Sequence, residues 1–154
     1  MKIFGANIND VLAVYLTRAM PKTTQISVFQ LLRKVPPTVR PTVTAARRMV
    51  RGIAPVAEEM ICMSRPPHSP RYMWKLLVYA VDGATVLGIG TFPRHSTVYF
   101  YRGRELDDGS GLLQGSGKES RFITLLSPAE AEMPALKKLV RKAFKLAGAP
   151  IPSR

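Results

Sequence analysis

The sequence predicts an α+β fold in which an antiparallel sheet of about five strands carries the N- and C-terminal helices on one face. Three observations lead to this class: helical spacing of apolar residues before residue 54, short strand-like runs between residues 58 and 126, and a clean helical stripe near the C-terminus. Helices followed by strands and a final helix are typical of a sheet covered on one side. The length of 154 residues suits one domain with a single core.

Two helices are expected before the strands. Residues 27–34 form the first, which Val35-Pro36-Pro37 ends because proline lacks a backbone donor and restricts the residue before it. The second begins at Pro37 or Pro41 and runs to Ile53, and Pro41 favours the later start because proline is tolerated only in the first turn. Gly52 and Pro55 are expected to close it. Its predicted buried stripe consists of Val43, Ala46, Met49, Val50 and Ile53.

The strands are predicted from β-branched and aromatic runs bounded by turn residues. They are expected at residues 60–63, 72–81, 85–92, 96–101 and 121–126. Asp82-Gly83 between the second and third runs is a strong hairpin signal. The glycine-rich connection 102–120 is expected to hold one helical turn near residues 105–113.

A C-terminal helix closes the domain. Ser127-Pro128-Ala129-Glu130 has the spacing of a capping box, and it predicts a brief first turn before a main helix that starts near Pro134. Gly148 and Pro150 end the helix. We therefore expect an N-terminal extension or added helix at 1–26, with Met20 as an alternative start, a domain at 27–148 and a tail at 149–154. The apolar stripe of the helix is Leu136, Leu139, Val140, Ala143, Phe144 and Ala147.

Charge is the strongest compositional signal. The chain has 23 lysine and arginine side chains against 10 acidic ones, a formal net charge of +13, which favours a nucleic-acid, other polyanionic or acidic protein partner. The alternative is a solvated surface, because no aromatic residues are interleaved with the cations for base stacking. The candidate anion-binding residues are Arg40, Arg47, Arg51, Lys118, Arg121, Lys138 and Arg141. Arg48 lies beside the first three, and Lys137, Lys142 and Lys145 share the basic face of the C-terminal helix with Lys138 and Arg141, so the two helices could neutralise phosphates together.

Cysteine usage and hydropathy limit the remaining classes. Cys62 is the only cysteine, so the chain has no intramolecular disulfide and no multi-thiolate metal site. With no apolar run of roughly 18 residues, we expect a cytoplasmic protein without a membrane span. Cys62 and His68 could form a nucleophile–base pair, but a cysteine in a strand is usually a small buried hydrophobe, and no residue is assigned a catalytic role. His95 lies in the connection between the third and fourth predicted strands, and the sequence places no carboxylate to orient its ring. A non-catalytic binding or accessory module is the expected function.

A long glycine-rich signature lies in the connection between the fourth and fifth strands. The signature residues are Gly103, Glu105, Leu106, Asp107, Asp108, Gly111, Leu112, Gly115, Gly117, Lys118 and Arg121. With this signature, residues 27–147 resemble the YdhG-like domains, small bacterial proteins mostly of unknown function. The resemblance implies a frataxin-like sandwich and, since one bacillary member is described as an iron chaperone, iron handling. The chain has Met63-Ser64-Arg65-Pro66 where the family usually has Trp-Gly-Met-Pro.

Two kinds of site are conceivable within this signature. Glu105, Asp107 and Asp108 offer oxygen ligands to iron or another hard cation, although adjacent aspartates often cap or turn the chain. Gly115 and Gly117 with Lys118 and Arg121 could form an anion-binding nest, or the glycines could simply permit positive φ. A phosphate loop that hydrolyses nucleotides is not expected, because Glu119 follows the lysine and the segment leads into a strand.

Overall fold

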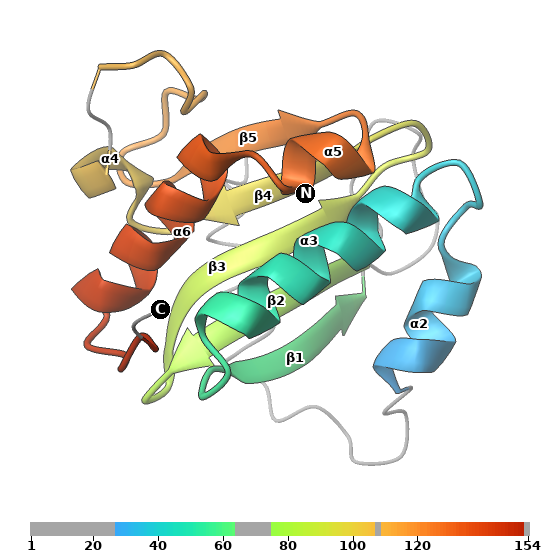
Figure 1. The fold of residues 1–154 in the computed structure, drawn as a ribbon, viewed down its shortest axis with the longest axis horizontal. Helices are drawn as coiled ribbons and strands as arrows, with labels where there is room; N and C mark the ends of the chain where they lie inside the picture. Colours follow the sequence, from blue (N-terminus) through green and yellow to red (C-terminus); the bar gives the residue numbers. More distant parts are fainter. Residues whose placement is uncertain (1–26, 64–74, 107–108, 153–154) are drawn as a thin grey trace, which may run out of the picture.

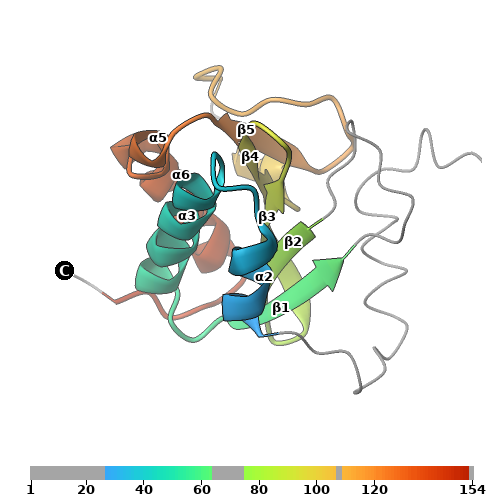
Figure 2. The same cartoon turned by 90° about the vertical axis from the view of Figure 1, so that its right-hand side faces the viewer.

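The structure is a computed structural model that describes residues 27–63, 75–106 and 109–152. Its centre is a five-stranded sheet in the order β1-β2-β3-β4-β5, in which each strand pairs antiparallel with its neighbour in the sequence. Figure 1 shows α3 and α6 lying across this sheet, and Figure 2 shows α3, α5 and α6 together on one side of it. The predicted α+β class and the covered face are therefore confirmed. The strands are β1 (Glu58–Met63), β2 (Lys75–Val81), β3 (Ala84–Thr91), β4 (Ser96–Phe100) and β5 (Arg121–Leu125).

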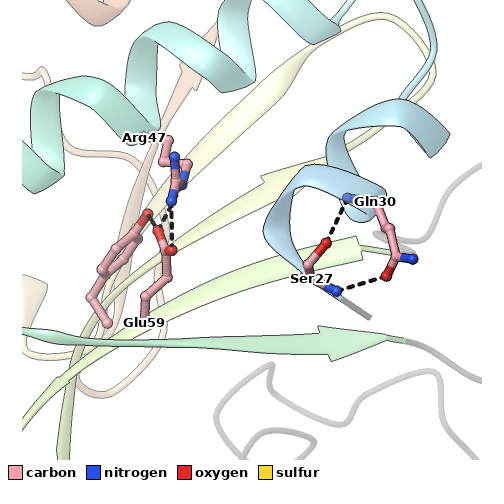
Figure 3. A network of polar contacts seen from close by, with 5 residues as sticks. Ser27, Gln30, Arg47 and Glu59 are labelled. Carbon is pink, nitrogen blue, oxygen red and sulfur yellow. Dashed lines mark hydrogen bonds and ion pairs between the residues drawn. The ribbon is translucent and has the colours of Figure 1, made fainter. Parts of the chain in front are cut away.

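The helices follow the predicted order. They are α2 (Val28–Lys34), α3 (Arg40–Ile53), α4 (Gly103–Leu106), α5 (Pro128–Ala131) and α6 (Pro134–Leu146). A reciprocal capping box begins α2. The backbone N–H of Gln30 donates to Ser27 Oγ at 3.2 Å, and the backbone N–H of Ser27 donates to Gln30 Oε1 at 2.9 Å (Figure 3). Pro41 is accepted near the start of α3, where its missing N–H would have no partner in the helix.

Local sequence signals explain most of the boundaries. Asp82 has φ 50° and Gly83 has φ 80°, so the predicted hairpin turn between β2 and β3 is confirmed. The brief turn after Ser127 is confirmed as α5. The predicted turn at residues 105–113 was placed too late, since α4 already begins at Gly103.

The predicted end of the second helix at Ile53 is confirmed, since α3 ends there with Ala54 as its cap. Gly52 lies in the last turn of α3, and Pro55 follows the cap. Residues 72–74 of the second predicted strand and residues 1–26 of the predicted extension lie outside the described residues.

The main core lies between the sheet and the helices. Strand residues alternate between the two faces, so Leu77 and Tyr79 join this core while Val78 joins a smaller cluster with Cys62 and Tyr101. The predicted apolar stripes of α3 and α6 are buried against the sheet, apart from Ala147, which is partly buried. Fully buried members of the core from both layers include Val43, Ala46, Val50, Leu77, Leu87, Val98, Phe100, Leu136, Val140 and Phe144.

Candidate functional site

An open cleft of about 330 Å³ lies between the helices α3 and α6 on the covered side of the sheet. They bring together segments that lie about 90 residues apart in the sequence. Residues 149–152, predicted as a tail, return to the same region, with Ala149 buried in the core and Ile151 and Pro152 at the cleft. The lining residues are Arg48, Met49, Gly52 and Ile53 from α3, Lys137 and Arg141 from α6, and Glu132, Ile151 and Pro152 from the connecting segments.

The cleft carries more positive than negative charge. Arg48, Lys137 and Arg141 supply three cations, and Glu132 supplies the only carboxylate among the lining residues. Lys137 Nζ lies 2.9 Å from Glu132 Oε2, so one cation is already paired. Arg48 is exposed and Arg141 half-buried, which leaves both guanidinium groups accessible from the cleft. Such a site attracts anions, most strongly at low salt.

The outer surfaces of the same two helices extend this positive charge. Both helices bury their apolar stripes against one sheet face and lie together on that side of the sheet (Figure 2). Their exposed residues therefore lie on the opposite side of each helix, away from the sheet. Arg51 of α3 and Lys138 and Lys142 of α6 are all exposed, and Lys145 is exposed further along α6. We call the set of Arg48, Arg51, Lys137, Lys138, Arg141, Lys142 and Lys145 the helical cationic face.

Arg47 was a candidate anion ligand, but it has a different role in the structure. Its Nε and Nη2 atoms each donate to a Glu59 carboxylate oxygen at 2.9 Å, and the Tyr79 hydroxyl donates to Glu59 Oε2 at 2.7 Å (Figure 3). Burial alone would raise the pKa of Glu59, but the hydrogen bonds from Arg47 and Tyr79 outweigh it and leave this pKa below its usual value. Burial, together with the carboxylate beside it, raises the pKa of Tyr79. Arg47 thus ties α3 to the edge of the sheet.

Arg40 is likewise occupied within the fold. Its Nη2 donates to the Arg33 carbonyl at 3.0 Å and to the Val35 carbonyl at 2.9 Å. These carbonyls lie at the end of α2 and just after it, so the guanidinium joins α2 to the start of α3. Of the seven candidate anion ligands, Arg51, Lys138 and Arg141 come together on the helical cationic face, and Arg40 and Arg47 do not.

The signature loop is held together by its own contacts. Arg121 begins β5 and donates from Nη1 to the Gly117 carbonyl at 2.6 Å and to the Ser120 carbonyl at 2.8 Å. Gly103 is buried against the same residue, so a Cβ added at this position would lie only 2.4 Å from Arg121 Cβ. Gly115 has φ 114° and faces the ring of Phe122. Lys118 is exposed in the loop, but Arg121 points to carbonyl groups, which do not bind anions.

Other members of the signature also have structural surroundings. Leu106 is buried in the core and Leu112 packs partly buried against it. Gly111 has φ 80°, a backbone conformation that suits glycine. These positions stabilise the loop that links β4 to β5, so the signature predicts a local structure more directly than a ligand.

The predicted metal ligands offer little to a cation in the described residues. Glu105 accepts two hydrogen bonds from Arg102, one of 2.8 Å to Oε1, and the hydrogen bond from Arg102 lowers the pKa of the Glu105 carboxyl group. Asp107 and Asp108 lie outside the described residues. In the part of the chain that is described, no group of three or more His, Cys, Asp or Glu side chains could hold a metal ion. Glu105 is the one predicted ligand that the structure describes, and Arg102 already engages it, so the cation site stays a prediction.

Neither Cys62 nor His95 lines the cleft. Cys62 is buried with Val78 and Tyr101, and burial raises the pKa of its thiol. The His95 ring stacks on Phe92 with 4.5 Å between the ring centroids, and partial burial lowers its pKa. His68 lies outside the described residues, so the hypothetical Cys62–His68 pair cannot be placed.

Comparisons with known proteins add no relatives. No protein-family model, curated protein or solved structure matches this chain. The resemblance to the YdhG-like domains thus stays a prediction. Over residues 27–63, 75–106 and 109–152, no helix has the length and apolar character needed to cross a bilayer.

The sequence placed all three cleft cations on the basic faces of two helices, but it did not predict that they share a cleft. Arg141 was singled out as a candidate ligand, whereas Arg48 and Lys137 were named only as members of those faces. Arg48 and Lys137 each lie next to the predicted apolar stripe of a basic helix, and this position is the sequence signal that could have selected them. Which flank faces the other helix depends on how the two helices pack.

Proposed function

We propose that this protein is a non-catalytic binding module that holds a polyanion, with nucleic acid as the first candidate, on its helical cationic face. The observation that carries the proposal is the juxtaposition of α3 and α6, whose cations line one cleft although the segments are distant in sequence. Helices covered with lysine and arginine can each be mere solvated surface. Two of them sharing one outward face can neutralise several phosphates of the same strand.

The global charge supports the same proposal. A formal net charge of +13 attracts anions from a distance and speeds association, but it does not select where they bind. The local arrangement supplies that selection, because Arg47 and Arg40 are occupied within the fold while Arg51, Lys138 and Lys142 are exposed. Phosphate contacts of this kind give affinity with little sequence preference.

Fluorescence anisotropy with labelled single- and double-stranded DNA tests the proposal. The variant R51Q/K138Q/K142Q removes three cations of the helical cationic face, and R94Q/R104Q/K118Q removes three exposed cations elsewhere. Both variants lower the net charge from +13 to +10, so long-range attraction is matched. We expect the first variant to weaken binding at least about tenfold more than the second at about 0.15 M salt.

The salt dependence gives a second readout. If each lost cation contacts a phosphate, the slope of log K against log salt should become shallower by about 3 in the first variant and change little in the second. Equal weakening in both variants, or wild-type binding that vanishes near physiological salt, would show that the helical cations are only solvated surface.

A further inference from the structure

The cleft between α3 and α6 combines apolar residues with three cations of the helical cationic face. Met49 and Ile53 are almost fully buried, with 5% and 7% of their surface exposed, and they supply apolar walls beside the half-buried Ile151. Arg48 and Arg141 border the same space with guanidinium groups. A polymer backbone needs only the cations, so the apolar walls indicate a ligand that has an apolar part as well.

Gly52 leaves room on one wall of the cleft. It lies within α3, near its C-terminal end, where glycine is less favourable for the helix than alanine. A Cβ at this position would meet no atom within 4 Å, so packing against the rest of the fold does not require glycine here. A side chain added at residue 52 would instead extend into the cleft.

The Glu132–Lys137 pair adjusts the charge of the cleft. The two groups are 2.9 Å apart, with 47% and 26% of their side-chain surface exposed. An incoming anion competes with Glu132 for Lys137, and an exposed pair of this kind is weak enough to exchange partners. The carboxylate therefore opposes anion binding in the cleft, and its removal should strengthen that binding.

We propose that this cleft binds a phosphate monoester that carries a planar apolar group, namely a nucleotide, either free or at the end of a nucleic-acid strand. Arg48 and Arg141 hold the phosphate, since guanidinium groups bind phosphate oxygens in a planar, bidentate geometry. Met49, Ile53 and Ile151 contact the base. The volume of about 330 Å³ is at the lower end of the roughly 300–1,000 Å³ of small-molecule pockets. The proposal extends the polyanion-binding function and shares its helices.

Calorimetric titration with AMP, adenosine and inorganic phosphate tests the two-part recognition. We expect AMP to bind at least about tenfold more tightly than either fragment, because only AMP reaches both the guanidinium groups and the apolar walls. Adenosine or inorganic phosphate binding as tightly as AMP would overturn the proposal. So would the absence of AMP binding at millimolar concentration.

Variants locate the binding. G52L should abolish AMP binding by filling the cleft, while G52A, which adds one methyl group to the same wall, should weaken it less than about threefold. R141Q should weaken it about tenfold, and E132Q should strengthen it about threefold by freeing Lys137. Thermal unfolding verifies that each variant is folded. If G52L is unstable, R141Q and E132Q still decide, and AMP binding unchanged in these two variants contradicts the proposal.

Two further experiments distinguish a free nucleotide from a strand end, and binding in the cleft from polyanion binding on the helical cationic face. If a 5′-phosphorylated 12-mer displaces AMP and its 5′-hydroxyl counterpart does not, the cleft binds strand ends. If neither 12-mer displaces AMP, the cleft binds free nucleotides. Duplex binding that is unchanged in G52L, together with lost AMP binding, supports a separate cleft site. AMP binding without duplex binding would refute the polyanion function and leave the cleft proposal intact.

Discussion

Arg47 differs from Arg48 and Arg51 of α3 because its guanidinium is paired with a carboxylate within the fold. It makes a bidentate contact with Glu59, whose side chain is only 9% exposed, and the Tyr79 hydroxyl donates a third hydrogen bond to the same carboxylate. A buried charge that loses its partner is strongly destabilising, although Arg47 keeps a third of its side-chain surface in solvent and so moderates the effect. One residue of the basic helix therefore stabilises the protein while its neighbours remain available to a ligand.

Removing the negative charge of Glu59 should reduce stability. In E59Q, Arg47 loses its ionic partner, and we expect the free energy of unfolding at pH 7 to fall by about 2 kcal/mol in urea denaturation. E58Q is the matched control, because Glu58 is the adjacent, exposed glutamate of the same strand. Equal stability of E59Q and E58Q would contradict this role of the ion pair.

The same pair predicts a pH dependence. The pKa of Glu59 in the folded protein is lower than its ordinary value of 4.5, so the folded state favours the ionised form. This stabilisation is complete above pH 4.5 and disappears as the pH falls through the lowered pKa of the folded protein. The stability difference between wild type and E59Q should therefore close in acid, below pH 4.5.

At the scale of elements, periodicity and breakers were sufficient to predict most helices and strands. The capping signals at Ser27 and Ser127 and the turn residues Asp82-Gly83 act over two to four positions, so the sequence contains all of their determinants. The Arg47–Glu59–Tyr79 network could not be predicted, because it requires the register of β1 on β2 and the position of α3 above them. The cleft required the packing of α3 against α6, which no local signal specifies.

The signature glycine Gly103 illustrates the same limit. A glycine-rich connection suggests turns, yet Gly103 is needed because α4 lies directly against the start of β5. In G103A the new Cβ would lie 2.4 Å from Arg121 Cβ and 2.7 Å from the Arg121 amide nitrogen, so backbone would have to move. We expect a loss of about 2–3 kcal/mol in the free energy of unfolding.

G52A provides the matched control for G103A, since it makes the same chemical change at a helical position with open space around it. It should leave stability unchanged or raise it by up to about 1 kcal/mol, because alanine favours the helix. A G103A protein within about 0.5 kcal/mol of wild type in urea denaturation would refute the requirement for glycine at this contact.

At the scale of the whole molecule, the fold separates charge from structure. The sheet and the buried stripes of α3 and α6 supply the core, and the signature loop closes β4 onto β5 through Arg121 and its carbonyl partners. The exposed cations of α3 and α6 belong to two helices that lie on the same side of the sheet (Figure 2). We therefore expect the polyanion to bind on the helical side of the molecule and away from the glycine-rich loop.

Amide chemical-shift mapping of the isotopically labelled protein tests this placement most directly. A DNA duplex is added at about 0.15 M salt, where non-specific attraction is partly screened. We expect the largest shifts in residues 48–52 of α3 and 137–145 of α6, while residues 111–121 of the signature loop change little. Shifts concentrated in that loop, or spread evenly over every exposed lysine and arginine, would contradict binding on the helical cationic face.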